Sequence, residues 1–311
     1  MQTMYRRRYS RWSKAIANFT ALVCVCVFVL PFVLLYKRRA QRPLFITFAH
    51  IGNYGRLGNQ IFQVAATIGI SHDYGVSWRF PERITNTPVG ELFELRGDLD
   101  DDLALTLSRH SEGTEIFHRV KVHTKHGQPV SLHGYFQWPQ YFEKSHDLIR
   151  SVLRVNPKLV AIVQRRFPEL VTQKSVAIHV RRGDYVELQH IYNVLGIEYY
   201  LKALDYVDFD HVYIVSDDNS WCETELSPRI RSSHTISDFH DELLDFTLLY
   251  LSDSLIISSS SFSWWAAFLK EAHFPSENRT IVAPKNRYNS QGDHSYLNLK
   301  SYYPTSWKLL D

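Results

Sequence analysis

Two consecutive arginines follow a short apolar segment in the middle of the chain, and they have the chemistry of an anion-binding site. Residues 176–180 (Val-Ala-Ile-His-Val) are rich in β-branched residues, which is typical of a strand buried on both faces. Gly183 permits a turn directly after Arg181 and Arg182, so both arginines are expected at the carboxyl end of the strand, where open α/β sheets bind ligands. Because a guanidinium group matches phosphate oxygens in shape and charge, the segment predicts a pyrophosphate-bearing substrate.

Two other interpretations of this segment stay open. One arginine could form a structural ion pair with Asp184 while the other faces solvent. Alternatively, residues 182–184 (Arg-Gly-Asp) could be an adhesion tripeptide, which acts from an exposed loop tip. A tripeptide that directly follows a buried strand is poorly placed for adhesion, so the choice lies mainly between phosphate binding and an ion pair.

Polar groups also follow two other predicted strands. Residues 216–218 (Ser-Asp-Asp) come after the strand predicted over 212–215, and a carboxylate there could accept hydrogen bonds from guanine or ribose. Each aspartate could equally cap the next helix. Residues 258–261 are four serines, which together with Ser263 place hydroxyls and backbone N–H groups at a helix N-terminus, an arrangement that binds anions. A single capping serine would not explain four in a row.

The elements that must position these groups alternate along the second half of the chain. Helical patterns separate the strand-like runs there, and this alternation predicts a parallel sheet of Rossmann type. The first half has one strand followed by a loop with Gly52, Gly55 and Gly58, and then a helix with Asn59 as its expected N-cap. We expect loops and short elements over 80–130 and one or two helices over 145–163. The strand-like runs are residues 44–49, 176–180, 212–215, 255–258 and 281–283.

The N-terminus predicts a membrane anchor. Residues 15–36 contain no charged side chain, and their number suits the roughly 20 residues that cross a bilayer. The segment is too long for a cleaved signal peptide and lacks a small-residue cleavage site. We expect residues 1–14 to be a cytoplasmic tail, 15–36 a transmembrane signal-anchor and 37–43 a short stem. Five basic residues precede the span and four follow it, which favours a cytoplasmic N-terminus only slightly.

Charge and cysteine content narrow the class further. The whole chain has a net charge of +3, and removing the nine basic residues of the anchor region leaves −6 for the rest. A nucleic-acid-binding domain of that sign would be unusual. Cys24 and Cys26 lie in the predicted span, so Cys222 has no partner for a disulfide bond downstream. We expect Cys222 to be a buried apolar residue rather than a nucleophile.

These segments, taken in order, resemble the α1,2-fucosyltransferases, a metal-independent inverting family that uses GDP-fucose. The resemblance covers nearly all of residues 44–311, and the ordered set is far more specific than any single motif. The matching segments are Gly-Arg-Leu-Gly-Asn-Gln at 55–60, Gly-Tyr-Phe-Gln at 134–137 with Tyr-Phe-Glu at 141–143, His-Val-Arg-Arg-Gly-Asp-Tyr at 179–185, Ser-Asp-Asp at 216–218 with Trp-Cys at 221–222, and Ser-Ser-Phe-Ser-Trp-Trp at 260–265.

The resemblance implies a two-lobed α/β fold of the GT-B kind. Residues 44–165 would form the acceptor-side lobe and residues 166–311 a Rossmann-like lobe that binds GDP-fucose. It also implies a type II topology in the Golgi membrane, with the catalytic part in the lumen. Asn278 starts the usable glycosylation triplet (Asn-Arg-Thr) of that part.

The resemblance also assigns roles to individual residues. Ser259 stands where many members have asparagine, so no role is carried over to it. The expected catalytic residues are Arg182 and Asn59. The expected donor-binding residues are Arg181 and Arg182 as a diphosphate clamp, His179 as a nucleotide contact, Asp184 and Asp217, Ser260, Ser261 and Ser263 as a phosphate-binding turn, and Gly58 facing them across the cleft.

The implied reaction moves L-fucose from GDP-β-L-fucose to a glycan hydroxyl, in particular the 2-hydroxyl of a terminal galactose. It proceeds by a single inverting displacement and needs no metal or other cofactor; the partners are the donor and an acceptor glycan. Two alternatives stay open. The Asp-x-Asp patterns at 98–100, 100–102 and 208–210 would suit a metal-dependent sugar-nucleotide transferase, and a catalytically silent glycan- or partner-binding homologue would keep the same motifs.

Overall fold

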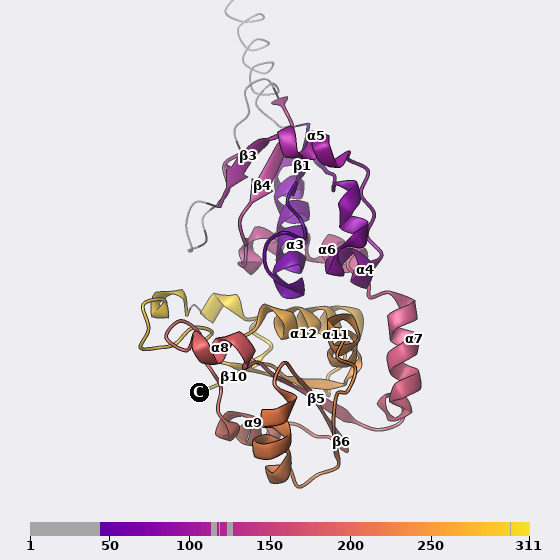
Figure 1. The fold of residues 1–311 in the computed structure, drawn as a ribbon, viewed down its shortest axis with the longest axis vertical. Coiled ribbons are helices and arrows are strands. Elements are labelled where there is room, and N and C mark those ends of the chain that lie inside the picture. The colour runs from indigo at the N-terminus through magenta and orange to yellow at the C-terminus, as the bar shows by residue number, and fades with distance from the viewer. Residues whose placement is uncertain (1–43, 113–116, 118, 123–126, 299) are drawn as a thin grey trace, which may run out of the picture.

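The computed structural model describes residues 44–311 apart from 113–116, 118, 123–126 and 299. The predicted tail, anchor and stem lie outside the described residues. Within the described part, no helix has the length and apolar character needed to cross a membrane. The chain forms two lobes that lie one above the other, and helix α7 (Pro157–Arg166), which follows the first lobe in sequence, runs down one side of the second (Figure 1).

The first lobe contains a parallel four-stranded sheet in the order β2-β1-β4-β3. Its strands are β1 (Phe45–Thr47), β2 (Ser77–Trp78), β3 (Ser108–Ser111) and β4 (Val130–His133). Helix α3 (Leu57–Tyr74) connects the first two strands and is buried over residues 57–58 and 60–71. A helix that is apolar around most of its circumference must be covered on several sides. It therefore lies between the sheet and the second lobe.

The start of α3 differs from the expectation that Asn59 is its N-cap. The N-cap is Arg56, whose backbone is extended and whose side chain makes no capping hydrogen bond. The carbonyl of Arg56 instead accepts the first helical hydrogen bond, from the backbone N of Gln60 at 3.1 Å. Asn59 thus lies inside the first turn, and its side chain is available for contacts across the cleft.

Short elements and loops occupy the described residues of the range 80–130, as predicted there. They include η2 (Glu82–Asn86), α4 (Pro88–Phe93) and α5 (Asp101–Thr106). Residues 145–163 form parts of two helices, α6 (His146–Val152) and α7, because Pro157 and the capping side chain of Asn156 start a new helix. The remaining short elements before β5 are η4 (Pro139–Tyr141), η5 (Glu143–Ser145) and η6 (Pro168–Val171).

The second lobe contains a parallel six-stranded sheet in the order β10-β9-β8-β5-β6-β7. The strands are β5 (Ser175–Val180), β6 (His211–Ser216), β7 (His234–Ile236), β8 (Ser254–Ile256), β9 (Ile281–Pro284) and β10 (Lys308–Leu310). The predicted strands over 176–180, 212–215 and 281–283 are confirmed, whereas β8 ends two residues earlier than predicted. The strand order reverses at β5, because β6 lies on one side of it and β8 on the other. Such a switch point is where open α/β sheets bind ligands.

Helices and short turns cover both faces of this sheet. Among them, α11 and α12 face the first lobe, while α9 lies on the opposite side of the sheet (Figure 1). Their bounds are α8 (Gly183–Glu187), α9 (Ile197–Leu204), α10 (Asn219–Trp221), η7 (Cys222–Leu226), η8 (Ser227–Arg229), α11 (Glu242–Leu251), α12 (Ser261–His273), η9 (Ser295–Leu297) and η10 (Lys300–Tyr302).

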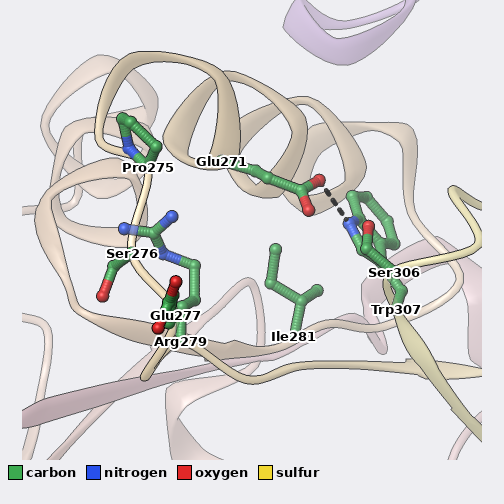
Figure 2. Close-up of a pocket in the computed structure, with 8 residues that line it drawn as sticks. All are labelled: Glu271, Pro275, Ser276, Glu277, Arg279, Ile281, Ser306 and Trp307. Carbon is green, nitrogen blue, oxygen red and sulfur yellow. Dashed lines mark hydrogen bonds between the residues drawn. The ribbon is translucent and has the colours of Figure 1, made fainter.

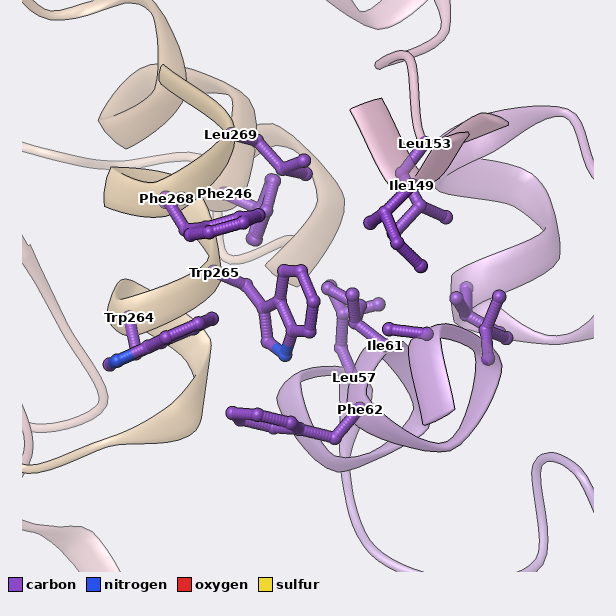
Figure 3. Close-up of a cluster of buried hydrophobic side chains, with 14 of the residues drawn as sticks. Leu57, Ile61, Phe62, Ile149, Leu153, Phe246, Trp264, Trp265, Phe268 and Leu269 are labelled. Carbon is purple, nitrogen blue, oxygen red and sulfur yellow. The ribbon is translucent and has the colours of Figure 1, made fainter. Parts of the chain in front are cut away.

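One hydrophobic cluster joins the two lobes (Figure 3). Phe62 of α3 packs against Trp265 and Trp264 of α12, with ring centroids 4.9 and 5.1 Å apart. Both tryptophans are almost completely buried. Leu57 and Ile61 of α3 are members of the same cluster. The first turns of α3 and α12 are therefore held against each other by tightly packed aromatic rings.

Candidate functional site

A cavity of about 330 Å³ lies where these two helix N-termini meet the carboxyl ends of β5 and β6. We call it the interlobe cavity. Its walls come from the loop before α3, from the residues after β5 and β6, and from the starts of α11 and α12. The sequence-predicted residues that line it are Gly58, Asn59, His179, Arg181, Asp184, Asp217, Ser260 and Ser261.

Arg181 is held in this cavity by two carboxylates. Its Nη1 atom lies 2.6 Å from Oδ2 of Asp217, and its Nη2 atom pairs with Asp184. The guanidinium also lies over the ring of Tyr185, with Cζ 5.0 Å from the centroid. Its Nε atom is buried and has no hydrogen-bond partner among the described residues. A fixed cation with an unused donor is suited to bind an anionic ligand.

His179 lines the same cavity as a neutral group. Its Nδ1 atom lies 2.8 Å from Oγ of Ser258 and 2.9 Å from Oγ of Ser263. Burial, together with the nearby charge of Arg181, lowers the pKa of His179 to about 3. The ring is thus uncharged near pH 7, and it can hydrogen-bond to a ligand through Nε2 but adds no positive charge.

The first turns of α3 and α12 touch directly at the cavity. A Cβ atom on Gly58 would lie 2.5 Å from the backbone N of Phe262, so glycine is required for this approach. The Oδ1 atom of Asn59 accepts a hydrogen bond from Oγ of Ser261 at 3.0 Å. Ser260 caps α12 by accepting from the backbone N of Phe262 at 3.3 Å. Two helix N-termini therefore converge on one place, where their partial positive charges favour an anion.

Residues 117–310 match the model of glycosyl transferase family 11. The chain belongs to this family. The family membership confirms the resemblance that the ordered motifs indicated.

Curated relatives of this family 11 glycosyltransferase match at low identity. The O-antigen biosynthesis glycosyltransferase WbnK of Escherichia coli is 25% identical over 201 residues, which are 60% of this chain and 64% of that protein. The alpha-1,2-colitosyltransferase of Escherichia coli is 27% identical over 151 residues, 45% of this chain and 51% of that protein. Galactoside alpha-(1,2)-fucosyltransferase 1 of Bos taurus is 26% identical over 237 residues, which are 69% of this chain and 64% of that protein. The chain thus spans 51–64% of the length of these relatives.

Two solved structures have the same fold. The crystal structure of POFUT1 in complex with GDP aligns with a TM-score of 0.51 at 12% identity and covers 78% of this chain and 99% of that one. The fucosyltransferase NodZ from Bradyrhizobium aligns with a TM-score of 0.50 at 12% identity. The alignment covers 72% of this chain and 92% of that one. The predicted α/β fold with parallel sheets is therefore confirmed as a glycosyltransferase fold.

Arg182 of this family 11 glycosyltransferase does not line the interlobe cavity. Its Cζ atom lies 4.2 Å from the ring centroid of Trp221, and its Nε donates to Oδ2 of Asp218 at 3.4 Å. Side chains alternate between the two faces of a strand, so His179 and Arg181 share one face and Arg182 continues the other. The structure thus separates the two arginines that the sequence presented as a pair.

Several of the other residues singled out in the sequence lie beside the interlobe cavity without lining it. Ser263 is fully buried beneath His179 and does not line the cavity. Asp218 caps α10 by accepting from the backbone N of Trp221 at 3.1 Å, as one interpretation of residues 216–218 allowed. Cys222 is fully buried, and burial raises the pKa of its thiol to about 11, so the expectation of an apolar role is confirmed.

Two acidic residues of the cavity wall were not predicted from the sequence. Glu242 and Asp245 lie at the start of α11 and line the interlobe cavity. Burial raises the pKa of both carboxyl groups, to about 6 for Asp245, although the hydroxyl of Ser237 donates a hydrogen bond to it. Nothing in the sequence of α11 distinguishes these residues from ordinary first-turn acids. Only the tertiary fold brings them to the cavity.

The Asp-x-Asp patterns take part in local structure. Asp100 caps α5 by accepting from the backbone N of Leu103 at 2.8 Å, and Asp98 pairs with Arg79 at 2.9 Å. Asp210 accepts from the backbone N of Lys174 at 3.0 Å. Over the described ranges, no group of three or more histidine, cysteine, aspartate or glutamate side chains is arranged to hold a metal ion.

Two of the other cavities lie close to the predicted site residues or to Asn278. One, of about 550 Å³, adjoins the interlobe cavity and shares Asn59 and Tyr192 with it. The other, of about 490 Å³, lies beside the end of α12, where Glu271 accepts from Nε1 of Trp307 at 3.0 Å (Figure 2). The exposed Asn278 lies in the turn that borders this cavity of about 490 Å³. None of the predicted donor-binding residues lines it.

Proposed function

We propose that this protein transfers L-fucose from GDP-β-L-fucose to the 2-hydroxyl of a terminal galactose, with inversion at the anomeric carbon. The observation that carries the proposal is the environment of Arg181. A guanidinium fixed by two carboxylates and keeping a buried, unused Nε donor faces a cavity where two helix N-termini converge. A diphosphate supplies the oxygens that such a set of donors needs.

The walls of the interlobe cavity suit the rest of the donor. Glu242 and Asp245 are acceptors for the N–H groups of guanine, and the neutral ring of His179 offers a further polar contact. The names of two relatives, an α1,2-colitosyltransferase and a galactoside α-(1,2)-fucosyltransferase, support both the linkage and the sugar class. The TM-scores near 0.5 support a GT-B-type arrangement of the two lobes, with the donor held by the second.

In the proposed reaction, the acceptor oxygen forms a bond to C1 of fucose while the bond from C1 to the β-phosphate oxygen breaks. The electron pair leaves with GDP, and negative charge grows on the diphosphate. Arg181 and the N-terminus of α12 are placed to stabilise that charge without moving, which is the largest contribution that a protein usually makes to such a step. Because these groups donate hydrogen bonds to the diphosphate, we propose that no metal ion is required.

The location is part of the same proposal. A signal-anchor at residues 15–36 would hold the enzyme in the Golgi membrane as a single-pass type II protein with its catalytic part in the lumen. Asn278 would then lie in the compartment where glycans are added, on an exposed turn. We expect the protein to bind GDP-fucose and an acceptor glycan, and not to bind nucleic acid.

The experiment that tests the function uses the full chain in detergent. It is incubated with GDP-fucose and a panel of galactose-terminated acceptors, with and without EDTA, and the product linkage is analysed. We expect α1,2-linked fucose with undiminished yield in EDTA. Loss of activity in EDTA that manganese restores would favour the metal-dependent alternative. No transfer to any acceptor would favour a silent homologue and contradict the proposal.

A further inference from the structure

The cavity of about 550 Å³ beside the interlobe cavity has the composition of a sugar-binding site. We call it the adjacent cavity. Aromatic side chains line it, among them Tyr135, Trp138 and Tyr288, and aromatic rings pack well against the apolar faces of sugars. Glu112 and Arg287 add groups of opposite charge. A site with one carboxylate and one guanidinium suits a neutral ligand that has many hydroxyl groups.

Arg287 provides an independent sign that a ligand binds there. The residue is 7% exposed, and no carboxylate among the described residues forms an ion pair with it. Its Cζ atom lies 4.7 Å from the ring centroid of Tyr302 and 5.2 Å from that of Tyr288. Its Nε atom is buried and has no hydrogen-bond partner in the described part of the chain. A buried donor left unsatisfied is costly unless a ligand accepts from it.

A chain of hydrogen bonds connects Arg287 with the interlobe cavity. Its guanidinium donates to Oε1 of Gln137, and Nε2 of Gln137 donates to Oδ1 of Asn59. The same Oδ1 atom accepts from Ser261 at the N-terminus of α12. Asn59 thus stands at the border between the two cavities, and a ligand in one would meet a ligand in the other there.

Glu112 is fixed in the wall of the adjacent cavity. Its Oε2 atom accepts from the backbone N of Tyr135 at 2.9 Å and from that of Phe136 at 2.7 Å, and Oε1 accepts from the hydroxyl of Tyr141 at 3.3 Å. The backbone adopts positive φ values of 146° at Gly134 and 51° at Phe136. This turn aims both N–H groups at one oxygen.

The four carboxylates that line the interlobe cavity among the described residues already have other roles in this account, since Glu242 and Asp245 are placed to accept hydrogen bonds from guanine. Asp184 and Asp217 are ion-paired with Arg181, the group that must stabilise the leaving diphosphate. Protonating either would remove a contact that orients Arg181. Glu112 is the carboxylate that lines the adjacent cavity within the described residues, and it makes no ion pair with Arg181.

We propose that the adjacent cavity binds the terminal neutral sugar of the acceptor and that Glu112 is the general base. This inference rests on the proposed function. The attacking hydroxyl gives its proton to the Glu112 carboxylate, its oxygen forms the bond to C1 of fucose, and the electron pair of the broken C1–O bond leaves with GDP. Arg287 donates from Nε to another hydroxyl of the same sugar and so fixes its orientation.

The test compares variants of the full chain with phenyl β-galactoside as acceptor and GDP-fucose as donor. Glu112→Gln should lower kcat by about 100-fold or more, the usual contribution of general-base catalysis. If Glu112 is the base, the wild type should lose rate at acid pH, and Glu112→Gln should not show that loss. Glu112→Asp, which keeps a carboxylate, should be intermediate. Affinity for GDP should stay within about twofold, since the donor site is separate.

Arg287→Lys tests the other half of the site. It keeps the charge but loses the planar fork, so the KM for the galactoside should rise by about 10-fold while the KM for GDP-fucose stays unchanged. The matched control is Glu277→Gln, an exposed glutamate in the turn after α12, which should behave as the wild type.

The outcomes separate the inference from the function it rests on. Wild-type turnover in Glu112→Gln would overturn the inference and leave the proposed function standing. A parallel fall in turnover, GDP affinity and melting temperature would also overturn it, because it would show that Glu112 only supports the turn at 134–136. A wild-type protein that moves no fucose would contradict the proposed function itself.

Discussion

The Nη1 atom of Arg181 lies 2.6 Å from Oδ2 of Asp217, which joins the ends of β5 and β6 across the switch point of the second sheet. The other oxygen of the same carboxylate accepts from the backbone N of Arg182 at 2.8 Å. One aspartate therefore fixes both the side chain that enters the interlobe cavity and the backbone that turns the next side chain away. A Cβ atom on Gly183 would lie 2.5 Å from this carboxylate, so glycine makes the arrangement possible.

The contact between α3 and α12 predicts a steric effect at Gly58. Gly58→Ala places a Cβ atom 2.5 Å from the backbone N of Phe262 and 2.6 Å from Oγ of Ser261. Because a helix backbone cannot move cheaply, the substitution should cost about 1–3 kcal/mol of stability and weaken GDP binding. Thermal unfolding and calorimetric titration with GDP measure the two effects.

Gly196→Ala is the control for Gly58→Ala. Nothing lies within 4 Å of a Cβ atom at Gly196, and its φ of −84° is open to any residue. The melting temperature and GDP affinity should change little. Equal effects at the two positions would show that the close approach of α3 and α12 is not what glycine is needed for.

The raised pKa of Asp245 predicts a dependence of stability on pH. Burial raises the pKa to about 6 from an ordinary value of 3.8, so the folded protein holds a proton between these values that the unfolded chain has lost. Stability should therefore fall as pH rises through this window. Asp245→Asn removes the titration, so its melting temperature should exceed that of the wild type above pH 6 and approach it below pH 4.

Asp238→Asn provides a contrast of opposite sign. Asp238 is exposed, and its hydrogen bond with Arg166 lowers the pKa of the carboxyl group. Removing that charge should not raise the melting temperature above pH 6. An Asp245→Asn protein less stable than the wild type at pH 8 would contradict the burial of an uncompensated carboxylate at the start of α11.

The proposed anchor predicts that replacing residues 1–42 with a cleavable signal peptide produces a secreted, active enzyme. The described lobes begin after this segment, and their clusters of buried apolar side chains lie wholly within residues 44–311. In cells, the full chain should sediment with membranes, and its catalytic part should resist added protease until detergent is present. Mature protein that begins after Tyr36, or digestion without detergent, would overturn the type II assignment.

Much of the second lobe could be predicted because its central strands are continuous apolar runs. β5 and β6 are buried along nearly their whole length, and such runs are visible in the sequence. The strands β7 and β10 lie at the two edges of the sheet and are short and partly exposed. They therefore have no apolar pattern that distinguishes them from loops.

The site was predictable where chemistry follows directly after a strand. His179 lies in β5 and Arg181 directly follows it on the same side, so both reach the interlobe cavity, and alternation along the strand already separates Arg181 from Arg182. Glu112 and Arg287 could not be predicted, since 175 positions of sequence separate them and only packing of the two lobes places them in one cavity.

The central claim is that Arg181, rather than Arg182, stabilises the leaving diphosphate. Turnover of GDP-fucose per folded molecule, measured beside melting temperature for Arg181→Ala, Arg181→Lys and Arg182→Ala, tests it most directly. Arg181→Ala should lose about 100-fold or more in kcat, and lysine should recover only part of this because it lacks the planar fork. Arg182→Ala should be less stable because the contact of Arg182 with Trp221 is lost, and its kcat should fall far less than that of Arg181→Ala. A folded Arg181→Ala protein with near-normal kcat, or a greater loss in Arg182→Ala, would contradict the account.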